Sequence, residues 1–188
     1  MSTQTLPDDQ TSSTAAKTAS LHRLTLPGPM LQRGFWLYVW RVQTPKGERL
    51  YVGRTGDSSS PHATAPYTRM GQHLGFSKAQ NSLRRLLTEA GVEPEGCGQF
   101  ELISYGPIFP EIGMTKEQLR PDQMLLHTPV RDQMAALEKK LRDALVEAGH
   151  PVLNVVHSKK QYDAAHWEAV RNAFAEHFSG LGRFESCD

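Results

Sequence analysis

The stretch FWLYVWRVQTPKGERLYVG, residues 35–53, decides the fold of this chain, because it contains two short strand-forming runs separated by a turn. Residues 35–42 are rich in aromatic and β-branched side chains, which favour a strand. Residues 49–52 form a second, shorter run that stops at Gly53. The intervening residues 44–48 are polar and contain Pro and Gly, as is typical of a hairpin loop. We therefore predict an antiparallel hairpin.

One tyrosine lies in each predicted strand, so the hairpin brings the phenols of Tyr38 and Tyr51 close together. Arg69 and His73 follow in a predicted helix, four residues apart, and therefore project from the same helix face. Two phenols, a guanidinium and an imidazole together suit a phosphate group. Each residue also has a simpler interpretation. The tyrosines can be ordinary strand aromatics, Arg69 a surface ion-pair partner, and His73 a solvent-facing or hydrogen-bonded imidazole.

The remainder of the chain predicts an α/β fold of the α+β kind, with a short, mainly antiparallel sheet flanked by helices and a C-terminal helix. The predicted elements are a helix at 79–90, a strand at 99–105, an irregular stretch at 106–127, a helix from Thr128-Pro129 to Ala148, a strand at 152–156 and a final helix from about Asp163. We predict one domain over residues 21–182, with loop insertions at about 56–66 and 106–127. Residues 1–20 are polar and predict a disordered leader, and residues 183–188 a tail.

Glu138 lies on or beside the apolar stripe of the predicted 129–148 helix. That stripe consists of Met134, Leu137, Leu141 and Leu145. An inward carboxylate is costly unless a cation or hydrogen bonds meet it, which makes Glu138 a candidate functional group. The alternative is that it reaches water or pairs with Arg142 one turn later. Asn154 similarly interrupts an apolar run, either as a hydrogen-bonded strand end or as a functional amide.

Bulk properties limit the possible classes of protein. The chain has 188 residues, a net charge of +1 and two cysteines, too few for a disulfide framework. The first twenty residues lack the pattern of a signal peptide, and no run approaches the ~20 apolar residues that span a bilayer. We therefore expect a soluble, cytoplasmic protein, and any nucleic-acid site must be a local basic patch.

The order of these motifs resembles the GIY-YIG nuclease family over roughly residues 35–156. The motifs that carry the resemblance are Leu37-Tyr38-Val39, Tyr51-Val52-Gly53, the Arg69/His73 helix, Glu138 and Leu153-Asn154. There are departures from the family pattern. Trp36 and Leu37 replace the Gly and Ile of the first motif, and Val52 replaces the Ile of the second. Leu and Val preserve an apolar strand face, whereas Trp36 leaves the local backbone path open.

The resemblance implies a metal-dependent DNA endonuclease of a compact restriction or phage-defence type, which hydrolyses phosphodiester bonds with a tyrosine-activated water. The implied catalytic residues are Tyr38, Tyr51, Arg69, His73, Glu138 and Asn154. Glu138 would bind Mg²⁺ (or Mn²⁺), and Asn154 would fix Glu138 or a tyrosine through hydrogen bonds. The resemblance leaves open which tyrosine is the general base; we favour Tyr38, with His73 as its partner.

The implied partner is DNA, with a homodimer as one route to double-strand cleavage. Candidate residues for the DNA path are Arg41, Arg54, Arg84, Arg85, Lys159 and Lys160. A solvated surface position is the alternative for each of them. Two other functions remain open, a non-catalytic nucleic-acid-binding module on the same scaffold and a structure-specific repair nuclease.

Overall fold

A computed structural model of the chain describes residues 19–56, 62–113 and 120–182. In these residues three antiparallel strands form one sheet in the order β2-β1-β3. Their bounds are β1 (Gly34–Thr44), β2 (Gly47–Arg54) and β3 (Gln99–Pro110). The predicted α+β fold class and the β1–β2 hairpin are therefore confirmed. Residues 1–18, 57–61, 114–119 and 183–188, which include most of the predicted leader, parts of both predicted insertions and the tail, lie outside the described residues.

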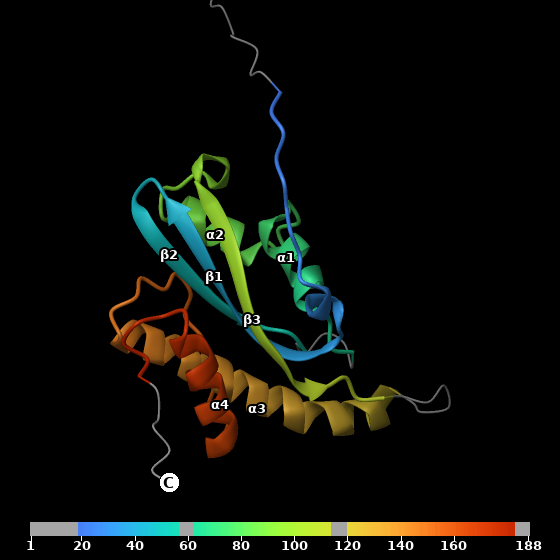
Figure 1. Cartoon of the computed structure of the whole chain (residues 1–188). Helices are drawn as coiled ribbons and strands as arrows, with labels where there is room; N and C mark the ends of the chain where they lie inside the picture. The colour runs from blue at the N-terminus through green and yellow to red at the C-terminus, as the bar shows by residue number, and fades with distance from the viewer. Residues whose placement is uncertain (1–18, 57–61, 114–119, 183–188) are drawn as a thin grey trace, which may run out of the picture.

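Helices cover both faces of the sheet, as Figure 1 shows. They are α1 (Pro66–Leu74), α2 (Ser82–Glu89), α3 (Arg120–Glu147) and α4 (Ala164–Ala175), with 3₁₀ turns η1 (Gly28–Leu31) and η2 (Pro94–Gly96). Helix α4 starts where predicted, because the Asp163 carboxylate accepts a hydrogen bond from the His166 N–H at 3.1 Å. Within the described residues, no helix is both long enough and apolar enough to cross a membrane.

Alternate residues of the strands pack into two apolar clusters, one on each face. The first cluster joins the sheet to α3 and α4 through Leu37, Val39, Leu50, Val52, Met134, Leu137, Leu141, Leu145, Val170 and Phe174. The second joins it to α2 through Tyr38, Trp40, Val42, Tyr51, Leu83 and Leu87. Both tyrosines of the predicted site therefore face the α1–α2 side of the sheet.

Trp36 is accommodated by an irregularity in β1. The pairing of β1 with β3 shifts register between Phe35 and Leu37, so a β-bulge lies at Trp36. The Trp36 N–H donates to Thr55 Oγ1 at 2.8 Å. A Cβ atom on Gly106 of β3 would lie 2.9 Å from the indole, so the absence of a side chain there provides space for the ring. The bulky residue of the first motif is therefore buried without displacing the strand that follows it.

The prediction of an irregular stretch at 106–127 is wrong at both ends. Strand β3 continues to Pro110. Pro107 is tolerated within it because β3 lies at the edge of the sheet, where a residue that lacks a backbone N–H breaks no pairing with a further strand. Helix α3 already begins at Arg120 and passes through Pro129, which we expected at a helix start. Pro129 lies on the exposed side of the helix, where water can satisfy the carbonyl that lacks an N–H partner. The predicted helix at 79–90 is also shorter, as α2 spans 82–89.

The predicted strand at 152–156 is replaced by a single bridge to the edge strand β2. Val152 pairs with Leu50 in parallel. Around this bridge, the Leu50 N–H donates to Pro151 O at 2.9 Å, and the Leu153 N–H to Leu50 O at 2.7 Å. Beyond the bridge, the Asn154 side chain replaces the main chain as the hydrogen-bond partner of β2. Its Oδ1 accepts from the Val52 N–H at 3.0 Å, and its Nδ2 donates to Val52 O at 2.8 Å. A side-chain amide thus ends the pairing that a strand would have continued.

We expect Asn154→Ala to lower the free energy of unfolding by about 2 kcal/mol, because the buried N–H and C=O of Val52 both lose their partner. Urea denaturation followed by circular dichroism measures this. The matched control is Val155→Ala at the next, exposed position, which should change stability by less than about 0.5 kcal/mol. Equal effects of the two substitutions would contradict the role given to the amide.

Candidate active site

A cavity of about 510 Å³ opens between the β1–β2 hairpin, α1, the start of α2 and one residue of α3. Five of the six predicted catalytic residues line it, namely Tyr38, Tyr51, Arg69, His73 and Glu138. These residues are separated by up to a hundred positions in the sequence. The volume of the cavity is within the range of small-molecule sites. The cavity is therefore a candidate active site.

The hairpin register places Tyr38 directly opposite Gly53. A Cβ atom on residue 53 would lie 2.5 Å from Tyr38 Oη and Cζ, so the phenol packs directly against the Gly53 backbone. From there Tyr38 Oη lies 2.6 Å from His73 Nε2, in a buried hydrogen bond. The predicted Tyr38–His73 pairing is thus present in the structure, and Gly53 provides the space for it.

Burial disfavours the charged form of both partners of this hydrogen bond. It lowers the pKa of His73 to about 4, and the nearby Arg69 charge acts in the same direction. Burial, followed by the proximity of Tyr51, raises the pKa of Tyr38 well above its usual value of 10. Both groups are therefore neutral near pH 7, and when the imidazole carries its proton on Nδ1 the phenol can donate to Nε2. His73 Nδ1 is buried and has no hydrogen-bond partner among the described residues.

Tyr51 lies beside this pair, with its ring centroid 4.9 Å from that of His73. Burial and the Glu138 charge raise the pKa of Tyr51 to about 12, against the lowering effects of a hydrogen bond with Ser82 and of Arg69. Tyr51 is therefore a neutral phenol as well. It presents a hydroxyl group to the cavity, where it can donate to an anionic ligand.

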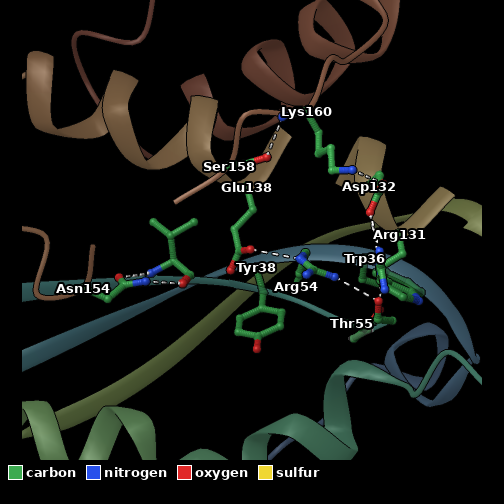
Figure 2. A network of polar contacts seen from close by, with 12 residues as sticks. Trp36, Tyr38, Arg54, Thr55, Arg131, Asp132, Glu138, Asn154, Ser158 and Lys160 are labelled. Atoms are coloured by element: carbon green, nitrogen blue, oxygen red, sulfur yellow. Dashed lines mark hydrogen bonds and ion pairs between the residues drawn. The ribbon is translucent and has the colours of Figure 1, made fainter. Parts of the chain in front are cut away.

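Glu138 approaches the cavity from the α3 side, whereas Tyr38 projects from the opposite side of the strands (Figure 2). Its Oε2 accepts a hydrogen bond from Arg54 Nε at 3.0 Å, and the side chains are only 15% and 17% exposed. Burial raises the pKa of Glu138, while the charge and hydrogen bond of Arg54, and the charge of Arg69, oppose that rise. The inward carboxylate predicted from the helix pattern is therefore present, and a cation meets it.

The donor set of the cavity fits a magnesium ion bound mainly through its substrate. Glu138 Oε1 accepts no hydrogen bond from a described residue, so one carboxylate oxygen is available to a cation. Among those residues no cluster of three or more His, Cys, Asp or Glu side chains surrounds such a position. Mg²⁺ often keeps several waters and uses one or two carboxylates together with phosphate oxygens. Glu138 suits that mode of binding, sharing its other oxygen with Arg54.

Asn154 does not line the cavity. Its amide hydrogen bonds to the Val52 backbone and not to Glu138 or a tyrosine, contrary to what the resemblance implies. Because Val52 lies between Tyr51 and Gly53, Asn154 fixes the backbone that carries one phenol and supports the other. Its contribution to the site is indirect.

The six residues predicted to contact DNA do not form one patch. Arg54 lies inside the cavity, a position that the sequence did not reveal, because nothing in its spacing shows that Glu138 is its partner. Arg84 and Arg85 are on α2 and form ion pairs with Glu95 and Glu89. Arg41 pairs with Glu101 and contacts Phe178. Lys160 pairs with Asp132, and Lys159 is exposed. Arg41 therefore lies on the α4 side of the sheet, away from the tyrosines.

Several further lining residues were not singled out from the sequence. They are Gly56, Thr64, Gln72, Ala79, Gln80 and Ser82, whereas His62, which also lines the cavity, belongs to the predicted 56–66 insertion and was a sequence candidate for contacting DNA. Most come from turns, where no periodic pattern marks the inward side. Comparison of the chain with protein-family models, curated proteins and solved structures gives no match. The resemblance to the GIY-YIG family stays a prediction.

We expect Arg54→Met to lower the free energy of unfolding by about 2–3 kcal/mol, because it leaves the Glu138 carboxylate largely buried without its cation. The control is Arg85→Met, which breaks an ion pair whose two side chains are each 56% exposed and should cost less than about 0.5 kcal/mol. The double variant Arg54→Met/Glu138→Met should recover part of the loss. Urea denaturation of all four proteins measures these differences, and equal losses in the two single variants would contradict the assignment.

The lowered pKa of His73 predicts a stability that depends on pH. Between pH 6.5 and about 4, His73 binds a proton in the unfolded chain but not in the folded one. Its contribution is therefore complete above pH 6.5 and is lost as the pH falls toward 4, by up to about 3 kcal/mol. His73→Gln should remove that part of the decline. Urea midpoints measured across this range test it, with exposed His157→Gln as the control that should follow wild type.

Proposed function

We propose that this protein is a metal-dependent DNA endonuclease of the GIY-YIG type, which hydrolyses a phosphodiester bond with water activated by Tyr38. The observation that carries the proposal is the buried 2.6 Å hydrogen bond between Tyr38 and His73. It lies in a cavity that also contains Tyr51, Arg69 and Glu138. A proton acceptor, an anion-binding guanidinium and a carboxylate are the groups that phosphodiester hydrolysis requires.

The proton path runs from water through Tyr38 to His73. A stable phenolate is disfavoured here, because burial raises the pKa of Tyr38. In a relay no free phenolate is needed: Oη takes a proton from the attacking water as it passes its own proton to His73 Nε2. The water oxygen then forms a bond to phosphorus, the bond from phosphorus to the leaving oxygen breaks, and that oxygen takes a proton from solvent.

Substrate binding favours this relay by its charge. Arg69 lowers the pKa of His73 in the free protein. A phosphate bound near Arg69 places negative charge beside the same imidazole and opposes that effect. His73 therefore becomes a better proton acceptor only when a phosphate is present. Tyr51 completes the arrangement, because its neutral hydroxyl can orient the phosphate or the water.

Glu138, through Oε1, is the residue that would hold Mg²⁺ (or Mn²⁺), with water and phosphate oxygens completing the ligand set. When bound, the ion supplies positive charge that neutralises the scissile phosphate and the leaving oxygen. Glu138 would thereby hold the ion on the side of the cavity where Arg69 would bind the phosphate. Arg54 keeps the carboxylate charged and oriented.

We propose restriction or phage defence as the biological setting, with DNA as the partner. One cavity of this kind cleaves one strand at a time. A double-strand break therefore requires a homodimer or two successive nicks.

Glu138→Gln and Tyr38→Phe should each abolish cleavage of supercoiled plasmid in Mg²⁺, because the first removes the metal-binding charge and the second the proton relay. We expect a loss of at least about a hundredfold for either, as is typical when an acid–base or metal contribution is removed. The assay follows conversion of supercoiled to nicked and linear DNA, with and without Mg²⁺. DNA binding should remain close to wild type, because phosphate contacts and not one carboxylate hold the substrate.

Glu147→Gln is the matched control, since it changes an exposed carboxylate on the same helix and should cut as wild type does. Normal cleavage by Glu138→Gln would contradict the metal assignment. Wild-type protein that binds DNA but does not cut it in Mg²⁺ or Mn²⁺ would support the non-catalytic binding module.

A further inference from the structure

Phe76 is unusually exposed for a phenylalanine, with 81% of its surface open to solvent. It belongs to the turn of residues 75–81 between α1 and α2, whose residues from Phe76 to Gln80 are all exposed. A large aromatic ring at such a position gains nothing from the apolar core. The proposed cleavage chemistry leaves the ring without a role.

The position of the ring is fixed by Arg84. The Arg84 guanidinium carbon lies 4.2 Å from the centroid of the Phe76 ring, in a close cation–π contact. Arg84 in turn donates to Leu74 O at 3.5 Å and forms an ion pair with Glu95. One side of the ring is thus covered by a planar cation that is itself held in place. We name Phe76 and Arg84 the stacking platform.

The stacking platform borders the candidate active site. Gln72 and His73 before the turn, and Ala79 and Gln80 within it, all line the cavity. The turn is tight, because Ser77 O accepts hydrogen bonds from the N–H groups of Gln80 and Asn81 at 2.9 and 3.0 Å. Phe76 is therefore only three residues along the chain from cavity-lining His73 on one side and from cavity-lining Ala79 on the other.

We propose that Phe76, backed by Arg84, stacks on an unpaired DNA base adjacent to the phosphate bound in the cavity. This inference rests on the proposed function. Bases inside a duplex already have both faces stacked, so the platform acts only on a single strand or on a base that has left the helix. Gln80 supports this assignment, since its amide lines the cavity and makes no hydrogen bond to a described residue. An amide of this kind both donates to and accepts from a base edge.

The charge of the surroundings favours a nucleic acid over a protein as the occupant. The guanidinium of Arg84, itself paired with Glu95, lies against the ring, and the cavity contains Arg69 and the Arg54–Glu138 pair. Lys78, in the same turn, is exposed. A base with its negatively charged phosphate matches an aromatic surface that a guanidinium contacts and that lies near Arg69 and Lys78 along the chain, as in proteins that bind single strands by stacking and backbone contacts. The platform therefore predicts a preference for unpaired DNA next to the cleaved bond.

The experiment measures binding of a short, labelled single strand of mixed sequence and of the matching duplex by fluorescence anisotropy, in EDTA so that neither is cut. Phe76→Ala and Phe76→Leu should weaken binding of the single strand about tenfold, because a base loses its stacking surface. Phe76→Trp should bind at least as tightly as wild type. Duplex binding should change less than twofold in all three variants. Leu125→Ala, which removes a different exposed apolar side chain, is the control and should have no effect.

Wild-type affinity of Phe76→Ala for the single strand would overturn the platform, as would wild-type affinity of Phe76→Leu, which would indicate apolar contact without stacking. Phe76 has too little buried surface for these substitutions to unfold the chain, and thermal melting verifies this. If wild type cuts plasmid while Phe76→Ala binds single strands normally, the proposed function stands and only the platform fails. If wild type neither binds nor cuts DNA, both are overturned.

Discussion

A side chain at position 53 would occupy the space of the Tyr38 phenol, since even a Cβ atom would lie 2.5 Å from its oxygen. This constraint links the fold to the site. The pairing of Tyr38 with Gly53 lets the ring lie over the neighbouring strand and reach His73 on α1. A slip of one residue in the hairpin would turn Tyr38 toward α3 and move the apolar residues of the strand out of the cluster in which each now packs. The geometry of the phenol–imidazole pair therefore depends on a register that both apolar clusters stabilise.

The edge of the sheet formed by β2, which contains Gly53, also shows how the protein satisfies buried polar groups. Strand β2 is an edge strand, and a side-chain amide, that of Asn154, satisfies the backbone of Val52 where pairing with another strand ends. Two residues later, at the end of β2, the Arg54 guanidinium forms an ion pair with Glu138. Both arrangements act on the short segment that contains Tyr51 and Gly53. Stability of this segment and organisation of the cavity are consequently supported by the same contacts, so we expect a substitution outside the cavity, such as Asn154→Ala, to disturb the cavity as well.

Much of this could be predicted from the sequence because it follows from local pattern. Alternating aromatic and β-branched residues with a Pro/Gly loop predicted the hairpin, and the 3.6-residue period of α3 placed Glu138 facing inward. The pairing of Tyr38 with His73 was also anticipated. Other features depend on surroundings that a sequence does not display. Pro129 is accepted inside α3 only because it lies on the exposed side, and Asn154 found a strand backbone where the family resemblance implied a catalytic neighbour. The Arg54–Glu138 pair joins positions 84 residues apart and has no periodic signature.

The chemistry proposed for the cavity acts on a phosphate and is therefore indifferent to base sequence, since every nucleotide carries the same group. Selection of a substrate must come from contacts around the cavity. Long-range attraction contributes little, because the net charge of the chain is +1, and several surface arginines are already paired with carboxylates. Short-range contacts close to the reacting phosphate must then provide a larger share of the binding. An exposed aromatic ring held by a cation supplies such a contact at little cost in conformational entropy, because both of its parts are already in place. If the proposed function holds, the protein would distinguish substrates first by whether a base is available to stack and only then by which base it is.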